Sequence, residues 1–182
     1  MLNMLPKFEL VPTQILLLIS LYDISEVPIP LDEVDAEQVR SPRVLDMNFI
    51  RNFMLVIGPI SSLFDFLTFY VMLAVLKADE MLFQTGWFVE SLTTQVLVIF
   101  VIRTRGNPFR SRAHPVLSAT SIAVVALAAL IPFTPVGNYF GFVPPPAKFY
   151  FILAAMVLAY LVIVEMAKRY FYRWVEASRG RG

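Results

Sequence analysis

The sequence contains no cysteine and a single histidine, His114, among its 182 residues. Without cysteine, disulfides, zinc ribbons, iron–sulfur clusters and thiol nucleophiles are excluded, and one histidine argues against metal sites or catalytic triads built on imidazole. Charge is also scarce: 16% of the residues are charged, and 15 Lys and Arg against 14 Asp and Glu give a formal charge of +1. This balance lacks the basic excess of a nucleic-acid-binding protein, so we expect no nucleic-acid partner.

Apolar residues are what the sequence has in excess. They make up 58% of the chain, and the mean hydropathy is +0.68. Four long apolar runs stand out, at residues 49–76, 83–102, 116–134 and 149–167. As a helix rising about 1.5 Å per residue, each run can cross a hydrocarbon core of about 30 Å.

A fifth run, residues 10–31, is weaker because it contains Asp23 and three prolines. We expect the prolines to break this span, and a broken span should be buried among the others, because unwound backbone is not tolerated against lipid. The alternative, a secretory signal peptide, lacks the small-residue cleavage pattern. The five runs predict an all-α integral membrane protein, a single domain over residues 1–182 with a bundle of about five transmembrane helices.

The Lys and Arg residues fall unevenly on the two sides of such a bundle. With five spans, the side of the N-terminus carries three of the fifteen, at Lys7, Lys77 and Lys148. The other twelve lie in or beside the loops after the first and third spans and after the last span. Because cytoplasmic loops are enriched in Lys and Arg, we predict the N-terminus outside and the C-terminus in the cytoplasm.

Three acidic residues, Asp23, Asp65 and Glu90, lie within the predicted spans. An ionisable side chain inside a membrane is costly unless it is paired or solvated, so each is a candidate functional residue. Asp23 is followed by prolines, and a carboxylate beside freed backbone carbonyls supplies the oxygen ligands that Mg²⁺ and Ca²⁺ prefer. The alternative is that Asp23 marks the membrane boundary and caps a helix.

The other two acids have hydroxyl side chains on the same helical face. Serines lie three and four residues before Asp65, which is either a metal ligand or part of a hydrogen-bonded contact between helices. Threonines lie three and four residues after Glu90, which is either a ligand or counter-ion facing the bundle or a group solvated near the external interface. Farther along, Glu165 is expected to form a surface ion pair with Lys168 and Arg169.

Four motifs occur in order along the chain: Leu21-Tyr-Asp-Ile-Ser-Glu-Val-Pro-Ile-Pro-Leu-Asp-Glu-Val-Asp35, Gly58-Pro-Ile-Ser-Ser-Leu-Phe-Asp65, Leu82-Phe-Gln-Thr-Gly-Trp-Phe-Val-Glu90 and Ile102-Arg-Thr-Arg105. Together they resemble the C-terminal membrane region of the magnesium-transporting P-type ATPases. The resemblance implies that the five spans are the sixth to tenth helices of such a pump, in a bacterial inner (plasma) membrane, with Mg²⁺ as the transported ion. It implies Asp23 and Glu90 as metal ligands and Asp65 as a motif residue.

The sequence departs from this family at the ion site, in an extra charged stretch at residues 7–12 and in its catalytic motifs. The family has an ion-coordinating asparagine where this chain has Ile19, so we expect Mg²⁺ binding by this chain alone to be weak or absent. The catalytic motifs are also missing, because no aspartate is followed by Lys-Thr-Gly, and Thr85-Gly86 is followed by Trp87 instead of glutamate. We therefore expect no catalytic residue, no ATP site, no bound cofactor and no cytoplasmic catalytic domain in this chain.

These observations favour the C-terminal membrane domain, or a fragment, of an ATP-driven Mg²⁺ transporter, which contributes part of the ion pathway without hydrolysing ATP. Its expected partners are the lipid bilayer and the missing N-terminal half of a pump. The alternative is a stand-alone membrane accessory protein that packs against an intact pump or another membrane protein through Asp65 and the small residues of 123–129. A passive cation conduit ranks last, because five spans with few intramembrane charges offer no second gate.

Overall fold

A computed structural model of the protein describes residues 10–32, 47–103 and 113–179. All regular structure in these ranges is helical, in the order α1 (Pro12–Glu26), η2 (Ile29–Leu31), α3 (Met47–Tyr70), η3 (Val71–Val75), α4 (Glu80–Ile102), α5 (Pro115–Leu130), η4 (Ile131–Phe133), α6 (Pro135–Tyr139) and α7 (Ala147–Arg179). Five segments are long and apolar enough to cross a membrane: Pro12–Leu31, Ile50–Val75, Glu80–Ile102, Pro115–Phe133 and Ala147–Arg173. The predicted all-α membrane bundle of five spans is confirmed, and its orientation stays a prediction.

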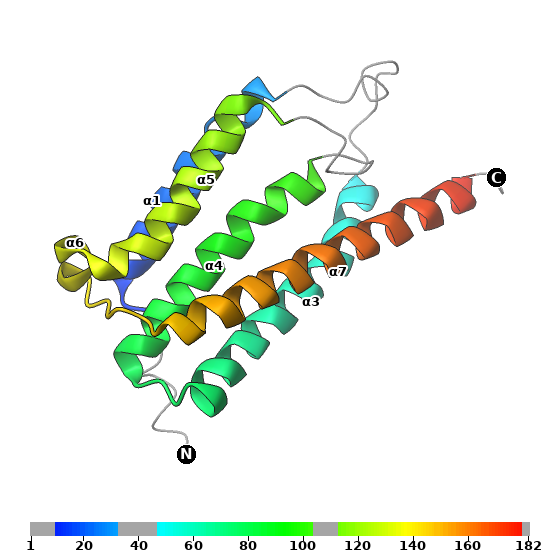
Figure 1. Ribbon diagram of the computed structural model, residues 1–182. Coiled ribbons are helices and arrows are strands. Elements are labelled where there is room, and N and C mark those ends of the chain that lie inside the picture. Colours follow the sequence, from blue (N-terminus) through cyan, green and yellow to red (C-terminus); the bar gives the residue numbers. More distant parts are fainter. Residues whose placement is uncertain (1–9, 33–46, 104–112, 180–182) are drawn as a thin grey trace.

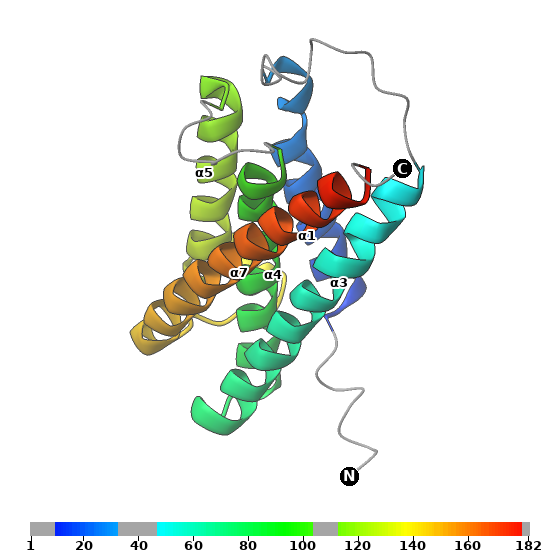
Figure 2. The same ribbon diagram turned by 90° about the vertical axis from the view of Figure 1, so that its right-hand side faces the viewer.

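Helix α4 runs through the centre of the bundle (Figures 1 and 2). Helices α1 and α5 pack against each other and against α4, while α3 and α7 pack against each other and against another side of α4. In the most apolar stretch of α4, 67% of the residues are buried, compared with 11% in α3. The larger core cluster is therefore built around α4, where Phe88, Leu92 and Val96 meet buried residues of α1, α5 and α7.

Helix α1 is continuous although its segment contains three prolines. Pro12 stands in the first turn, where a proline is tolerated because that N–H has no partner within the helix. The predicted break comes at the other end, where the helix stops at Glu26 and Pro28 leads into η2. Burial differs from our expectation, since 22% of the residues in this span are buried. An unbroken helix satisfies its own backbone groups and therefore tolerates lipid.

A tight reversal joins α3 to α4. The end of α3 widens into η3, one turn of π-helix, and Lys77 then adopts a left-handed backbone conformation with φ 48°. Asp79 caps α4 by accepting a 2.9 Å hydrogen bond from the backbone N–H of Leu82. Asp65 lies ten residues before the end of η3, and Glu90 lies ten residues after the start of α4. The two antiparallel segments therefore place both carboxylates at a similar depth.

Candidate cation site

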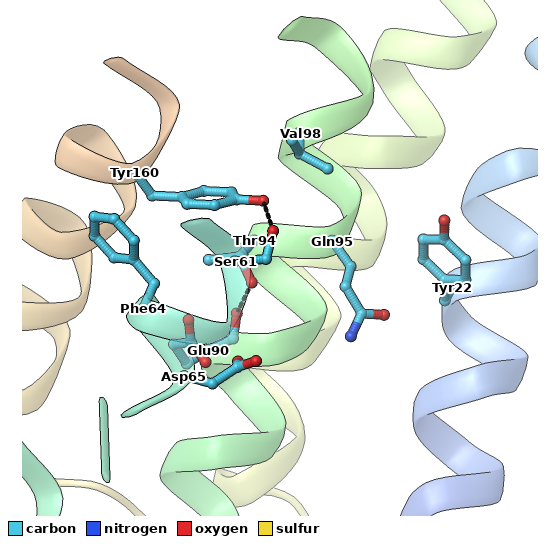
Figure 3. A pocket seen from close by; sticks show the side chains of 9 residues that line it. All are labelled: Tyr22, Ser61, Phe64, Asp65, Glu90, Thr94, Gln95, Val98 and Tyr160. Atoms are coloured by element: carbon cyan, nitrogen blue, oxygen red, sulfur yellow. Dashed lines mark hydrogen bonds between the residues drawn. The ribbon is translucent and has the colours of Figure 1, made fainter. Parts of the chain in front are cut away.

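A cavity of about 170 Å³ lies between α1, α3, α4 and α7 (Figure 3). It is lined by Tyr22, Ser61, Phe64, Asp65, Glu90, Thr94, Gln95, Val98 and Tyr160. Seven of these nine side chains carry oxygen and two of them are carboxylates, which is unusual for a hollow inside an apolar bundle. The cavity is therefore the candidate functional site.

Glu90 is the most enclosed charged group of this cavity. It lies on α4 with 2% of its surface exposed, and among the described residues its Oε2 atom has no hydrogen-bond partner. A carboxylate oxygen buried without a donor is costly, and the cost is removed by a cation, a proton or a donor from another molecule. Of the two interpretations drawn from the sequence, this position favours a group that faces the bundle over one solvated at the interface.

Asp65 reaches the same cavity from α3, where it is half-buried (Figure 3). One helical turn earlier, the Ser61 hydroxyl forms a 2.9 Å hydrogen bond with the Tyr160 hydroxyl of α7. The contact between helices that we considered for Asp65 is thus made by Ser61, and Asp65 itself faces the cavity beside it. Ser62, the other serine of this motif, is exposed on the outside of α3.

The threonine hydroxyl groups near Glu90 donate hydrogen bonds to backbone carbonyls of their own helix. Thr93 donates to the carbonyl of Val89 over 2.6 Å, and Thr94 donates to the carbonyl of Glu90 over 3.0 Å (Figure 3). Thr94 lines the cavity, whereas Thr93 is buried elsewhere in the core. An oxygen that donates its hydrogen to a carbonyl still has lone pairs to offer, so Thr94 can supply a neutral oxygen to the cavity.

Asp23 is placed apart from the two other acids. Its side chain is exposed on α1 and is not among the groups that line the cavity, although the preceding residue, Tyr22, lines it. Ile19, one turn earlier on α1, is also exposed. In the described parts of the chain, no cluster of three or more His, Cys, Asp or Glu side chains could hold a metal ion. The structure therefore unites Asp65 with Glu90 and leaves Asp23 outside their cavity.

Three polar residues of this site, Tyr22, Gln95 and Tyr160, were not among the ligands expected from the sequence, although Tyr22 lies within one of the motifs that carry the family resemblance. Tyr160 carried a usable signal, because it is a lone polar side chain in the middle of the apolar stretch of α7. Gln95 follows Glu90 by five residues, which does not place the two on one helical face. Its place in the cavity could not have been read from spacing.

The arrangement offers hard oxygen ligands and little else. Carboxylate, amide and hydroxyl oxygens are the ligands of Mg²⁺ and Ca²⁺, and Mg²⁺ takes about six of them in octahedral geometry. Two carboxylates with a few neutral oxygens make up part of such a shell. The described residues of the cavity include no thiol and no imidazole, which softer metals prefer.

The chain as a whole is similar to known membrane proteins. The chain matches the family model described as "Cation transporting ATPase, C-terminus" over residues 8–170. It is 37% identical over 174 residues to the "Magnesium-transporting ATPase, P-type 1" of Salmonella typhimurium (strain 14028s / SGSC 2262), and 36% identical over 174 residues to the protein of that name in Escherichia coli (strain K12). Each alignment covers 93% of this chain and 19% of the relative. The chain spans about a fifth of the length of the curated relatives it matches.

Proposed function

We propose that this chain, which belongs to the family of cation-transporting ATPase C-terminal domains, forms the C-terminal membrane domain of an ATP-driven Mg²⁺ transporter and provides part of its ion pathway. The observation that carries the proposal is the meeting of Glu90 and Asp65 in one cavity inside the bundle. Two carboxylates that share a small cavity repel each other, and a divalent cation between them removes both the repulsion and the cost of burial.

In this proposal Glu90 and Asp65 are the charged ligands, while Gln95 and Thr94 add neutral oxygens. This is an incomplete shell, and the remaining ligands would come from water or from a part of the transporter outside this chain. The relatives named as Mg²⁺-transporting ATPases extend well beyond the matched region, which leaves ample sequence for such a part. ATP hydrolysis is assigned to that part, because this sequence has no aspartate followed by Lys-Thr-Gly.

Asp23 is proposed as a second ion-binding position along the same pathway. It lies on an exposed face of α1, one residue from Tyr22 of the cavity, where a further membrane segment of the pump would pack. An exposed carboxylate in the middle of a bilayer is costly, so a polar or cationic group should cover it in the assembled transporter.

An immunoblot of native membranes tests whether the chain works within a pump. An antibody against residues 172–182 should detect a band several times larger than 20.7 kDa, or a band of this mass that co-purifies with a separate catalytic polypeptide. A band of 20.7 kDa without such a polypeptide would contradict the proposal. It would favour the stand-alone accessory protein, for which Ala123 and Ala126 on the exposed side of α5 offer a small-residue contact face.

The ion site is tested in the purified, detergent-solubilised chain by titrating Mg²⁺ at constant ionic strength and following thermal unfolding. Because the shell in this chain is incomplete and binding is expected to be weak, only high Mg²⁺ concentrations should raise the melting temperature, and the rise should be small. Glu90→Gln and Asp65→Asn should each abolish it. Glu80→Gln is the matched control, because Glu80 is an exposed acid on the same helix and should leave the rise intact. An equal rise in Glu90→Gln and in the unsubstituted chain would contradict a site at this cavity.

A further inference from the structure

A second hollow of the described structure lies away from the carboxylates, on the outer surface of the bundle. It is a groove of about 530 Å³ between α4 and α7, which cross obliquely (Figures 1 and 2). Its lining is apolar except at one end, where two charged residues stand, and consists of Leu97, Phe100, Val101, Leu158, Leu161, Val162, Glu165, Met166 and Arg169. We call it the α4–α7 groove.

The length of the α4–α7 groove matches one leaflet of a bilayer. Along α7 it runs from Leu158 to Arg169, and the eleven steps between these residues rise about 16 Å at about 1.5 Å each. The span itself runs from Ala147 to Arg173, so Leu158 lies near its middle and Arg169 near its end. One half of a hydrocarbon core of about 30 Å is the length of one acyl chain. The groove therefore reaches from the middle of the membrane to one interface.

The charged end of the groove carries a net positive charge. The Glu165 carboxylate is shared by two cations, at 2.6 Å from Arg169 Nε and 2.6 Å from Lys168 Nζ. Lys168 is fully buried and also donates to the Val101 carbonyl over 2.8 Å, whereas 53% of the Arg169 side chain is exposed at the mouth of the groove. Arg173, four residues later on the same face of α7, is exposed as well.

A transmembrane helix does not fit this surface. A helix that crosses the bilayer needs a contact face along the full hydrocarbon thickness, and close helix contacts in membranes use small residues. The α4–α7 groove covers one leaflet, and its walls are made of leucine, valine, phenylalanine and methionine. A flexible hydrocarbon chain can fill a groove with such walls without leaving polar groups unpaired.

We propose that the α4–α7 groove is a binding site for one phospholipid, with an acyl chain between α4 and α7 and the phosphate on Arg169 and Arg173. A guanidinium presents several donors in one plane and binds phosphate in a bidentate fashion. Since Glu165 holds Arg169 through Nε, its carboxylate orients the guanidinium at the groove mouth. The site is independent of the carboxylate cavity and of the proposed transport function.

Native mass spectrometry of the full chain, released from detergent after titration with dioleoyl phosphatidylglycerol, tests the site. The unsubstituted chain should retain one lipid at low lipid concentration. Dioleoylglycerol, which has the same acyl chains and no phosphate, should bind at least about fivefold more weakly, since one basic side chain near a charged lipid contributes about 1 kcal/mol. Equal retention of the two lipids would overturn the assignment of the phosphate to Arg169 and Arg173.

Two pairs of variants locate the bound lipid. Val162→Trp fills the groove and should lose the retained lipid, while Ile163→Trp adds the same ring to a neighbouring lipid-facing position outside it. Arg169→Ala should weaken retention about fivefold, while Lys148→Ala removes a cation at the other end of α7 and should not. Retention of lipid by Val162→Trp equal to that of Ile163→Trp would mean adventitious lipid only and would overturn the proposal.

Discussion

Asp32, at the end of η2, forms a 2.6 Å ion pair between its Oδ2 atom and Nη1 of Arg103, which follows the last residue of α4. Its second oxygen, Oδ1, accepts a 2.8 Å hydrogen bond from the backbone N–H of His114, the residue that caps α5. One carboxylate thus joins the ends of α1, α4 and α5. The two motifs that contain Asp32 and Arg103 are far apart in the sequence and meet here.

This junction should contribute measurably to stability. The side chains of Asp32 and Arg103 are 12% and 9% exposed, and removing one partner of a buried pair costs more than the pair itself contributes. We expect Asp32→Ala, which loses both contacts, to reduce the free energy of unfolding by about 2–4 kcal/mol. Asp32→Asn, which keeps an oxygen for the His114 N–H, should lose less. Thermal unfolding in detergent measures both variants, and a larger loss for Asn than for Ala would contradict this account.

Replacing Glu90 should stabilise the chain when no cation is present, in contrast to replacing Asp32. Its unpartnered Oε2 atom is buried in the bundle, so the folded chain bears an uncompensated cost. In Mg²⁺-free detergent, Glu90→Leu should raise the free energy of unfolding by about 1–3 kcal/mol, because the desolvation penalty is removed. Urea or heat unfolding in the presence of a chelator measures the change. If Glu90→Leu destabilises the chain under these conditions, the oxygen has a partner that the described residues do not provide.

Gly137 in α6 is predicted to tolerate no side chain. A Cβ atom there would clash with the backbone oxygen of Ile131 and come within 3.0 Å of the Pro132 Cα atom, and backbone cannot move aside as a flexible side chain can. Gly137→Ala should therefore destabilise the chain by about 2–3 kcal/mol. The matched control is Gly58→Ala in α3, where nothing lies within 4 Å of the added atom, and it should be neutral or stabilising by up to about 1 kcal/mol. Equal melting temperatures of the two variants would show that this turn rearranges freely.

Lys168 corrects the sequence prediction of a surface ion pair around Glu165. The pair with Arg169 does lie at the surface, but Lys168 is fully buried and holds the Val101 carbonyl of α4 as well as Glu165. Lys168→Met should therefore cost about 2–4 kcal/mol of unfolding free energy, because it leaves a carbonyl and part of a carboxylate without a donor. Arg169→Gln should cost less than about 1 kcal/mol, as exposed pairs do. Calorimetry of the two variants side by side distinguishes the roles, and equal losses would contradict them.

The spans could be predicted from the sequence because length and hydropathy decide which segments cross a membrane. Their packing could not, since α3 and α4 have similar mean hydropathies of 1.7 and 1.5 and yet differ widely in burial. Polar content held a clue, because Gln84, Glu90 and Ser91 on α4 need protein neighbours inside a bilayer. Helix rotation is set by packing against neighbours, so the meeting of Asp65 with Glu90 was not readable from spacing alone.

The candidate site was therefore predicted in part. Asp65 and Glu90 were named as acids of the membrane interior, and the structure adds that they share a cavity with Ser61, Gln95 and Tyr160. The place of Asp23 outside that cavity depends on the rotation of α1, and the polar residues of this helix are spread around it without marking one face.

The last turn of α4 has a mechanical consequence for the whole bundle. The Val101 carbonyl is held by α7 through Lys168, and Arg103, two residues later, is held by the segment after α1 through Asp32. Both attachments are made at the same end of helix α4, beyond the carboxylate cavity. A tilt of α4 at this end would therefore move its contacts with α7 and with the segment after α1 together. In the proposed transport role, such a tilt would alter the cavity that lies between these helices.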